Sequence, residues 1–161
     1  MLQKIGVSKA LTQDITLLIA IAFISFIFGI LVGRRRLITI LINIYVALAL
    51  IWAVPASFWS DGSMKVYAFL IVVIALTIFG KELFDIYMSG SGTGFLSRVF
   101  AMSFLEVVLI FSVIFYFLPE KTALEWISRE AYGYLTDGWF RFAWTLAPLV
   151  FLFVIHKKIN R

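Results

Sequence analysis

The sequence contains no cysteine and a single histidine, His156. Without cysteine, disulfides, cysteine-bound zinc and thiol nucleophiles are excluded. A metal site needs several ligands at suitable spacing, and His156 stands beside Lys157 at the end of an apolar run, which is typical of an interfacial ring. The motifs His-Glu-x-x-His and Gly-x-Ser-x-Gly are also absent. We therefore expect no catalytic residue, no metal and no cofactor, and a protein that is not an enzyme.

Charge is scarce as well. Charged residues make up 14% of the chain and apolar residues 63%, with a mean hydropathy of +1.03, whereas soluble domains have about 25% charged and 45–50% apolar residues. This composition predicts one integral-membrane domain over 1–161, folded as an all-α polytopic transmembrane helical bundle. The net charge of +5 lies largely at presumed inner helix ends, where it indicates orientation and attraction to anionic lipid rather than to nucleic acid.

Apolar runs predict where the chain crosses the bilayer. A core of roughly 30 Å needs about 20 residues of helix, and the runs lie at about 15–32, 37–58, 64–80, 98–118 and 139–156. Arg141 and Pro148 interrupt the last run, which is either a short kinked span or a re-entrant segment, so four to five spans are expected. Residues 122–135 begin with a capping-box pattern at Thr122 and predict one interfacial amphipathic helix.

The turn Gly33-Arg34-Arg35-Arg36 between the first two runs sets the predicted orientation. Short loops rich in Lys and Arg stay on the cytoplasmic side, so Arg34, Arg35 and Arg36 place this turn inside. Five spans then put the amino terminus outside and the carboxyl terminus inside. All five tryptophans fall on the side opposite the turn, which favours an outer aromatic belt. The segment Ser89–Gly94 has no Gly-Lys-Ser/Thr ending and is interpreted as a flexible cytoplasmic linker.

Glu106 is the one acidic residue deep in an apolar run. It lies about 12 Å into the fourth span at 1.5 Å per residue, where a charge costs on the order of 3 kcal/mol to insert. Ser25 and Asn43 lie at a similar depth, and Ser103 lies three residues before Glu106 on the same helical face. One hypothesis is that this layer conducts protons or ions or binds a small polar ligand. The other is that it forms interhelical hydrogen bonds that fix the register of the bundle.

Gly29 and Gly33 form a small-xxx-small pair in the first span. Such pairs let two helices approach closely, but they are also frequent by chance in apolar sequence.

Several short features occur together along most of the chain. Asp14 precedes the first span, Gly33-Arg34 forms the first turn, a Gly/Ser-rich loop leads into Leu96-Ser97-Arg98-Val99-Phe100, and Trp126-Ile127-Ser128 follows the fourth span. In these features the sequence resembles the colicin V production protein (CvpA) family of small bacterial inner-membrane proteins. The resemblance implies an accessory role in export or envelope physiology without catalytic residues.

The expected partners are the lipid bilayer, including anionic lipids at the inner face, and a membrane-protein partner or a second copy of the chain. The alternative is a channel, pore or small transporter component with a proton or ion path at Glu106.

Overall fold

The computed structural model describes residues 9–33, 36–79 and 95–159, and in this part of the chain all regular secondary structure is helical, without a strand. Its elements in order are α1 (Lys9–Val32), α2 (Leu37–Ala53), the 3-10 helix η2 (Ala56–Phe58), α3 (Gly62–Phe79), α4 (Phe95–Phe117), α5 (Glu120–Trp126), α6 (Arg129–Thr136) and α7 (Gly138–Ile159). The predicted all-α helical bundle is confirmed.

Helix lengths identify an integral membrane protein. α1, α3, α4 and α7 are each long and apolar enough to cross a bilayer. α2 has 17 residues, or about 26 Å of helix, and is also strongly apolar. The last apolar run, for which a re-entrant segment was the alternative, forms one continuous 22-residue helix that contains Pro148. α7 therefore has the length of a fifth span.

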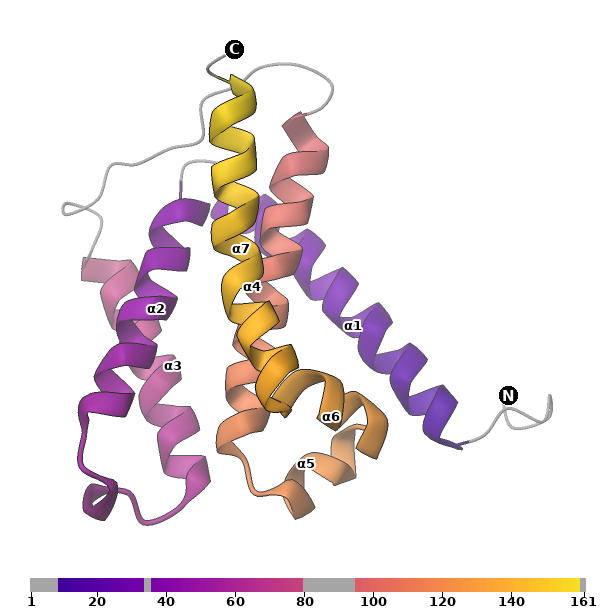
Figure 1. The fold of residues 1–161 in the computed structure, drawn as a ribbon, viewed down its shortest axis with the longest axis vertical. Helices are drawn as coiled ribbons and strands as arrows, with labels where there is room; N and C mark the ends of the chain where they lie inside the picture. Colours follow the sequence, from indigo (N-terminus) through magenta and orange to yellow (C-terminus); the bar gives the residue numbers. More distant parts are fainter. Residues whose placement is uncertain (1–8, 34–35, 80–94, 160–161) are drawn as a thin grey trace.

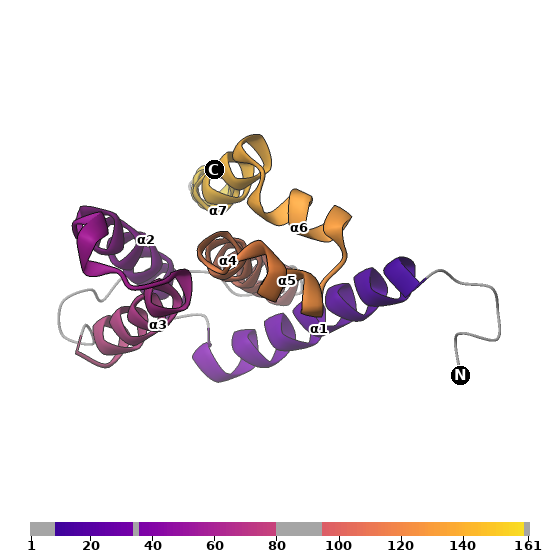
Figure 2. The same cartoon turned by 90° about the horizontal axis from the view of Figure 1, so that it is seen from below.

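α4 is the centre of the bundle. It packs against α1, α2, α3, α6 and α7, and Figure 2 shows it surrounded by the α2–α3 pair, α7 and α1. Of the most apolar window in α4, 56% is buried, against 11% in each of α1, α3 and α7. The other long helices thus use one face to contact the bundle and leave the rest exposed.

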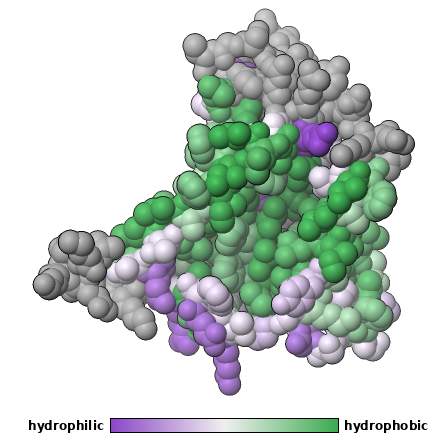
Figure 3. Space-filling model, turned by 180° about the vertical axis from the view of Figure 1, so that it is seen from behind, coloured by the Kyte–Doolittle hydropathy of each residue, from purple (hydrophilic) through white to green (hydrophobic). Residues whose placement is uncertain are grey.

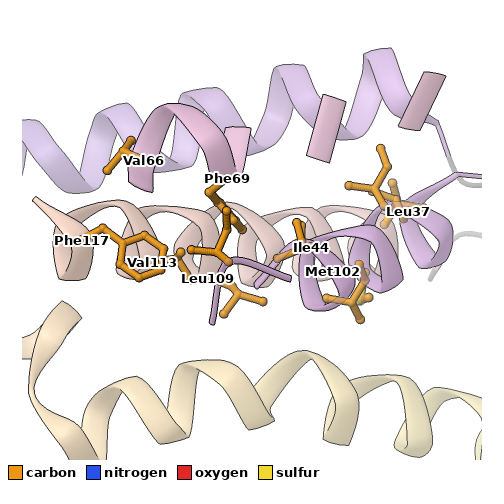
Figure 4. Close-up of a cluster of buried hydrophobic side chains, with 13 residues drawn as sticks. Leu37, Ile44, Val66, Phe69, Met102, Leu109, Val113 and Phe117 are labelled. Atoms are coloured by element: carbon orange, nitrogen blue, oxygen red, sulfur yellow. The ribbon is translucent and has the colours of Figure 1, made fainter. Parts of the chain in front are cut away.

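Two apolar clusters hold the helices to α4. The larger lies between α2, α3 and α4 and includes Ile44, Phe69 and Leu109, all fully enclosed (Figure 4). The smaller joins the other face of α4 to α1, α5 and α6 through residues such as Ile21 and Val108. Most side chains in these clusters are branched or aromatic, so each cluster buries much apolar surface.

The helices alternate in direction and define two ends of the molecule (Figure 1). We call one the arginine end, which holds Arg36, the start of α4 and the end of α7. The other is the tryptophan end, which holds the α2–α3 connection, α5, α6 and the start of α7. Trp52, Trp59, Trp126, Trp139 and Trp144 all lie in elements at this second end.

The predicted second span, 37–58, is too long. α2 ends at Ala53, and Val54 has the extended backbone (φ −73°, ψ 130°) that a residue before proline prefers. Pro55 then begins η2, and Trp59 closes it. The chain therefore leaves the helix five residues earlier than hydropathy alone indicates.

The single interfacial helix predicted over 122–135 is wrong, because two short helices occupy this stretch. α5 begins at Glu120 after Pro119, so Thr122 is inside the helix and not its cap. α6 begins after Ser128, whose hydroxyl accepts a hydrogen bond of 3.1 Å from the backbone N–H of Ala131. α5 thus ends at Trp126 with Ile127 as its C-cap, and Ser128 starts α6 as its N-cap.

The outer surface is strongly apolar across the middle of the molecule (Figure 3). Hydrophilic residues gather along the edge formed by the tryptophan end. α1 alone exposes Leu18, Phe23, Ile30 and Leu31 by more than half of their surface. A surface of this kind is stable only where lipid tails or other helices cover it.

Candidate functional site

All four residues of the predicted polar layer are buried. Ser25, Ser103 and Glu106 have no exposed surface, and Asn43 has 2%. They come from α1, α2 and α4. All four therefore face the interior of the bundle.

Two of the four make hydrogen bonds elsewhere. The Ser25 hydroxyl donates to the backbone carbonyl of Ile21 on its own helix at 2.6 Å. The Asn43 amide donates to the Thr77 hydroxyl at 3.3 Å and so joins α2 to α3. In the described part of the chain, no hydrogen bond connects any two of the four layer residues.

Ser103 of α4 lies against Gly29 of α1. A Cβ atom placed on Gly29 would lie 2.8 Å from the Ser103 hydroxyl oxygen and 3.5 Å from its Cβ, so only glycine fits here without displacement. Gly33, the other half of the small-xxx-small pair, has a φ of +65° and ends α1. Gly29 therefore allows close packing of α1 against α4, and Gly33 allows the turn after α1.

Glu106 is fully enclosed, and neither carboxyl oxygen has a hydrogen-bond partner among the described residues. Its neighbours one turn away on α4, Met102 and Leu109, are also fully buried and belong to the larger apolar cluster. The interhelical hydrogen bond proposed for this layer is present at Asn43 and is not made by Glu106. Tyr45 on α2 lies within electrostatic range of the Glu106 carboxyl.

Tyr45 also lines a cavity of about 490 Å³ between α2, α4 and α7. Its hydroxyl donates to the backbone carbonyl of Thr145 at 2.5 Å and ties α2 to α7. Arg141 lies on the opposite wall, with its guanidinium carbon 3.9 Å from the centre of the Tyr116 ring. The remaining lining residues are Leu48, Ala49, Trp52, Val113, Gly138 and Phe142.

This cavity was missed by the sequence reasoning. Arg141 was treated only as an interruption of the last apolar run, although an arginine one turn into a spanning helix needs a neighbour that accommodates its charge. An arginine at this position indicates a site. It does not identify the neighbouring side chain, because Tyr116 lies on α4 and Arg141 on α7. The structure supplies that information.

The residues expected to set the topology are only partly described. Arg36 is exposed at the start of α2, where its backbone carbonyl accepts from Ile40 at 2.8 Å. Arg34, Arg35 and the Ser89–Gly94 linker lie outside the described residues. Among the side chains that the structure describes, no group of three or more His, Asp and Glu comes together as a metal site, and the side chain of His156 is not among them.

No protein-family model, no curated protein and no solved structure matches this chain.

Proposed function

We propose that this chain is a non-enzymatic accessory or scaffold protein of the bacterial inner membrane, which acts through protein or lipid partners as its resemblance to the CvpA family implies. The observation that supports this is the course of α1, which crosses α4 obliquely and leaves the bundle toward its amino-terminal end (Figure 2).

The divergence of α1 forms a groove of about 430 Å³ between α1 and α4. Thr12, Thr16 and Ala20 line it from α1, and Phe111 and Trp126 line it from the other side. Small and hydroxylated residues at a helix surface favour close packing of another helix in a membrane. A transmembrane helix of a partner, or of a second copy of the chain, fits this groove.

Single-cysteine crosslinking tests the proposal directly, since the natural chain has no cysteine. Ala20→Cys places a thiol in the groove, and Ile71→Cys on the exposed face of α3 is the matched control. We expect a crosslinked product of defined mass in native membranes from Ala20→Cys and none from Ile71→Cys. Equal products from both positions, or none from either, would contradict the proposal.

The proposed orientation has the arginine end inside, with the carboxyl terminus, and the amino terminus outside. Exposed Arg36 at the start of α2 supports it through the positive-inside tendency. A membrane-impermeant maleimide should label Ser60→Cys in intact cells and should label Arg36→Cys only after lysis. The reverse pattern would overturn this orientation.

The second candidate is a channel or small transporter component, and Glu106 is the specific observation in its favour. A carboxyl group enclosed without a partner in a membrane bundle is typical of ion and proton pathways. Proton or cation flux into proteoliposomes, lost in Glu106→Gln, would establish this function in place of the accessory role. Absence of flux from correctly folded protein would exclude it.

A further inference from the structure

The cavity between α2, α4 and α7 lies near the tryptophan end of the molecule. Arg141 is three residues after the start of α7, or about 4.5 Å along that helix, and Trp52 is next to the last residue of α2. Thr145 and Tyr45 lie deeper, about 10 Å and 12 Å from the same end of their helices. The cavity therefore runs inward from the level where headgroups meet the protein.

The polarity of the residues that line the cavity changes from its shallow end to its deep end. The cation and the indole lie at the shallow end, where amphipathic side chains meet lipid headgroups. Leu48, Val113 and Phe142 form apolar walls below them. The hydrogen bond from the Tyr45 hydroxyl to the Thr145 carbonyl closes the deep end. Because these two groups satisfy each other, neither is left unpaired beside an apolar occupant.

Among the described residues, no acidic side chain forms an ion pair with Arg141. The ion pair found among the described residues joins Arg129 to Glu120, at 3.9 Å and on the exposed surface. Arg141 instead lies over the Tyr116 ring, which orients the guanidinium and leaves its five N–H donors available to an anion. Guanidinium groups match phosphate in charge and in geometry.

We propose that this cavity binds an anionic phospholipid, with its phosphate at Arg141 and one acyl chain between α2, α4 and α7. A free phosphate ion satisfies the guanidinium but leaves the apolar walls uncovered, whereas a lipid satisfies both. The volume lies within the range of small-molecule sites, roughly 300–1,000 Å³. The inference goes beyond the accessory role and depends only on the placement of the chain in a bilayer.

The experiment measures lipid retention by the purified full chain. The protein is reconstituted with phosphatidylglycerol and phosphatidylcholine, extracted mildly, and the lipid that remains bound is quantified by native mass spectrometry. The wild type should retain phosphatidylglycerol preferentially. Arg141→Gln should lower that preference on the order of fivefold, the effect of one basic residue near an anionic surface, and Arg141→Lys should restore part of it.

Two further variants separate this site from general attraction and from binding of the headgroup alone. Lys121→Gln removes one exposed charge at the same end of the molecule and should leave the preference unchanged. Ala49→Phe fills the apolar part of the cavity and retains Arg141, so it should reduce retention of both lipids. Circular dichroism shows that each variant is folded before it is compared.

Four results would overturn the proposal: equal retention of the two lipids by the wild type, equal loss in Lys121→Gln and Arg141→Gln, unchanged retention in Ala49→Phe, or thermal stabilisation by inorganic phosphate as large as that by phosphatidylglycerol. The last result would identify a small-anion site instead.

Discussion

Exchanging Glu106 for methionine changes a buried carboxyl group into an apolar side chain of similar length and should raise the stability of the protein. The carboxyl group has no exposed surface and no hydrogen-bond partner among the described residues. Its surroundings on α4, Met102 and Leu109, are apolar and fully enclosed. Methionine adapts to irregular space, so we expect it to fill this position without a cavity.

The magnitude follows from the cost of an unsatisfied buried polar group, about 1–3 kcal/mol. Interactions of polar groups within membranes are worth less than this in measured cases, averaging about 0.6 kcal/mol, because the reference state also finds partners. We therefore expect Glu106→Met to raise the free energy of unfolding by about 1–2 kcal/mol. At 2–4 °C per kcal/mol for a chain of this size, the melting temperature in detergent should rise by roughly 2–8 °C.

Two control variants separate the effect of polarity at position 106 on stability from the effects of side-chain volume and of net charge. Glu106→Gln keeps the volume and leaves an equally unpartnered amide, so its melting temperature should stay near that of the wild type. Glu125→Met removes an exposed carboxyl group on α5 and should change stability by no more than about 0.5 kcal/mol.

The measurement is thermal unfolding followed by tryptophan fluorescence and circular dichroism. If Glu106→Met lost more than about 1 kcal/mol while Glu125→Met was neutral, the reasoning would be refuted. That result would mean that the Glu106 carboxyl group binds something which a single chain does not supply.

Three further predictions test how the helices are held together. Gly62→Ala should cost about 1–3 kcal/mol of stability by overpacking, because its Cβ would lie 2.0 Å from a backbone carbonyl oxygen of α4, whereas Gly133→Ala, with open space around it, should gain about 0.5–1 kcal/mol. Thermal melts of the two variants side by side decide this, and equal changes would contradict it. Gly29→Ala should lower the melting temperature, and the double variant with Ser103→Ala should recover it, since removing the hydroxyl clears the 2.8 Å approach; no recovery would contradict the proposed contact. Ser112→Ala should cost about 1–2 kcal/mol, because its buried hydroxyl donates to a backbone carbonyl of α6 at 2.5 Å; amide hydrogen exchange in α6 should accelerate, and unchanged exchange would contradict this role.

The sequence was sufficient to predict the helical bundle and the order of its apolar helices. These properties depend on local composition and on the fixed rise of a helix, so counting residues recovers them. Helix ends were less accurate where a cap or a proline decides them. Pro55 shortened α2, and Ser128 divided the expected interfacial helix into two.

The facing directions of the polar residues were not predictable. Asn43 and Tyr45 are two residues apart on α2, which separates them by about 200° around the helix, so Asn43 meets α3 while Tyr45 meets α7. Which side faces which neighbour depends on how the helices are arranged. In a membrane protein, apolar residues cover both the lipid-facing and the buried sides, so hydropathy does not distinguish them. For the same reason the sequence did not identify α4 as the central helix.

α4 also carries more buried polar side chains than any other helix in the described part of the chain. Ser103, Glu106 and Ser112 have no exposed surface. Ser103 lies against Gly29 of α1, and the Ser112 hydroxyl donates a hydrogen bond to a backbone carbonyl of α6, so helix packing explains both. Packing does not explain Glu106, whose carboxyl group joins no helices in the described part of the chain. Stability and flux therefore answer separate questions about it. A stabilised Glu106→Met variant without a flux defect supports the accessory role. A stabilised variant that has lost flux supports the channel, because Glu106 would then be needed for conduction although it lowers stability.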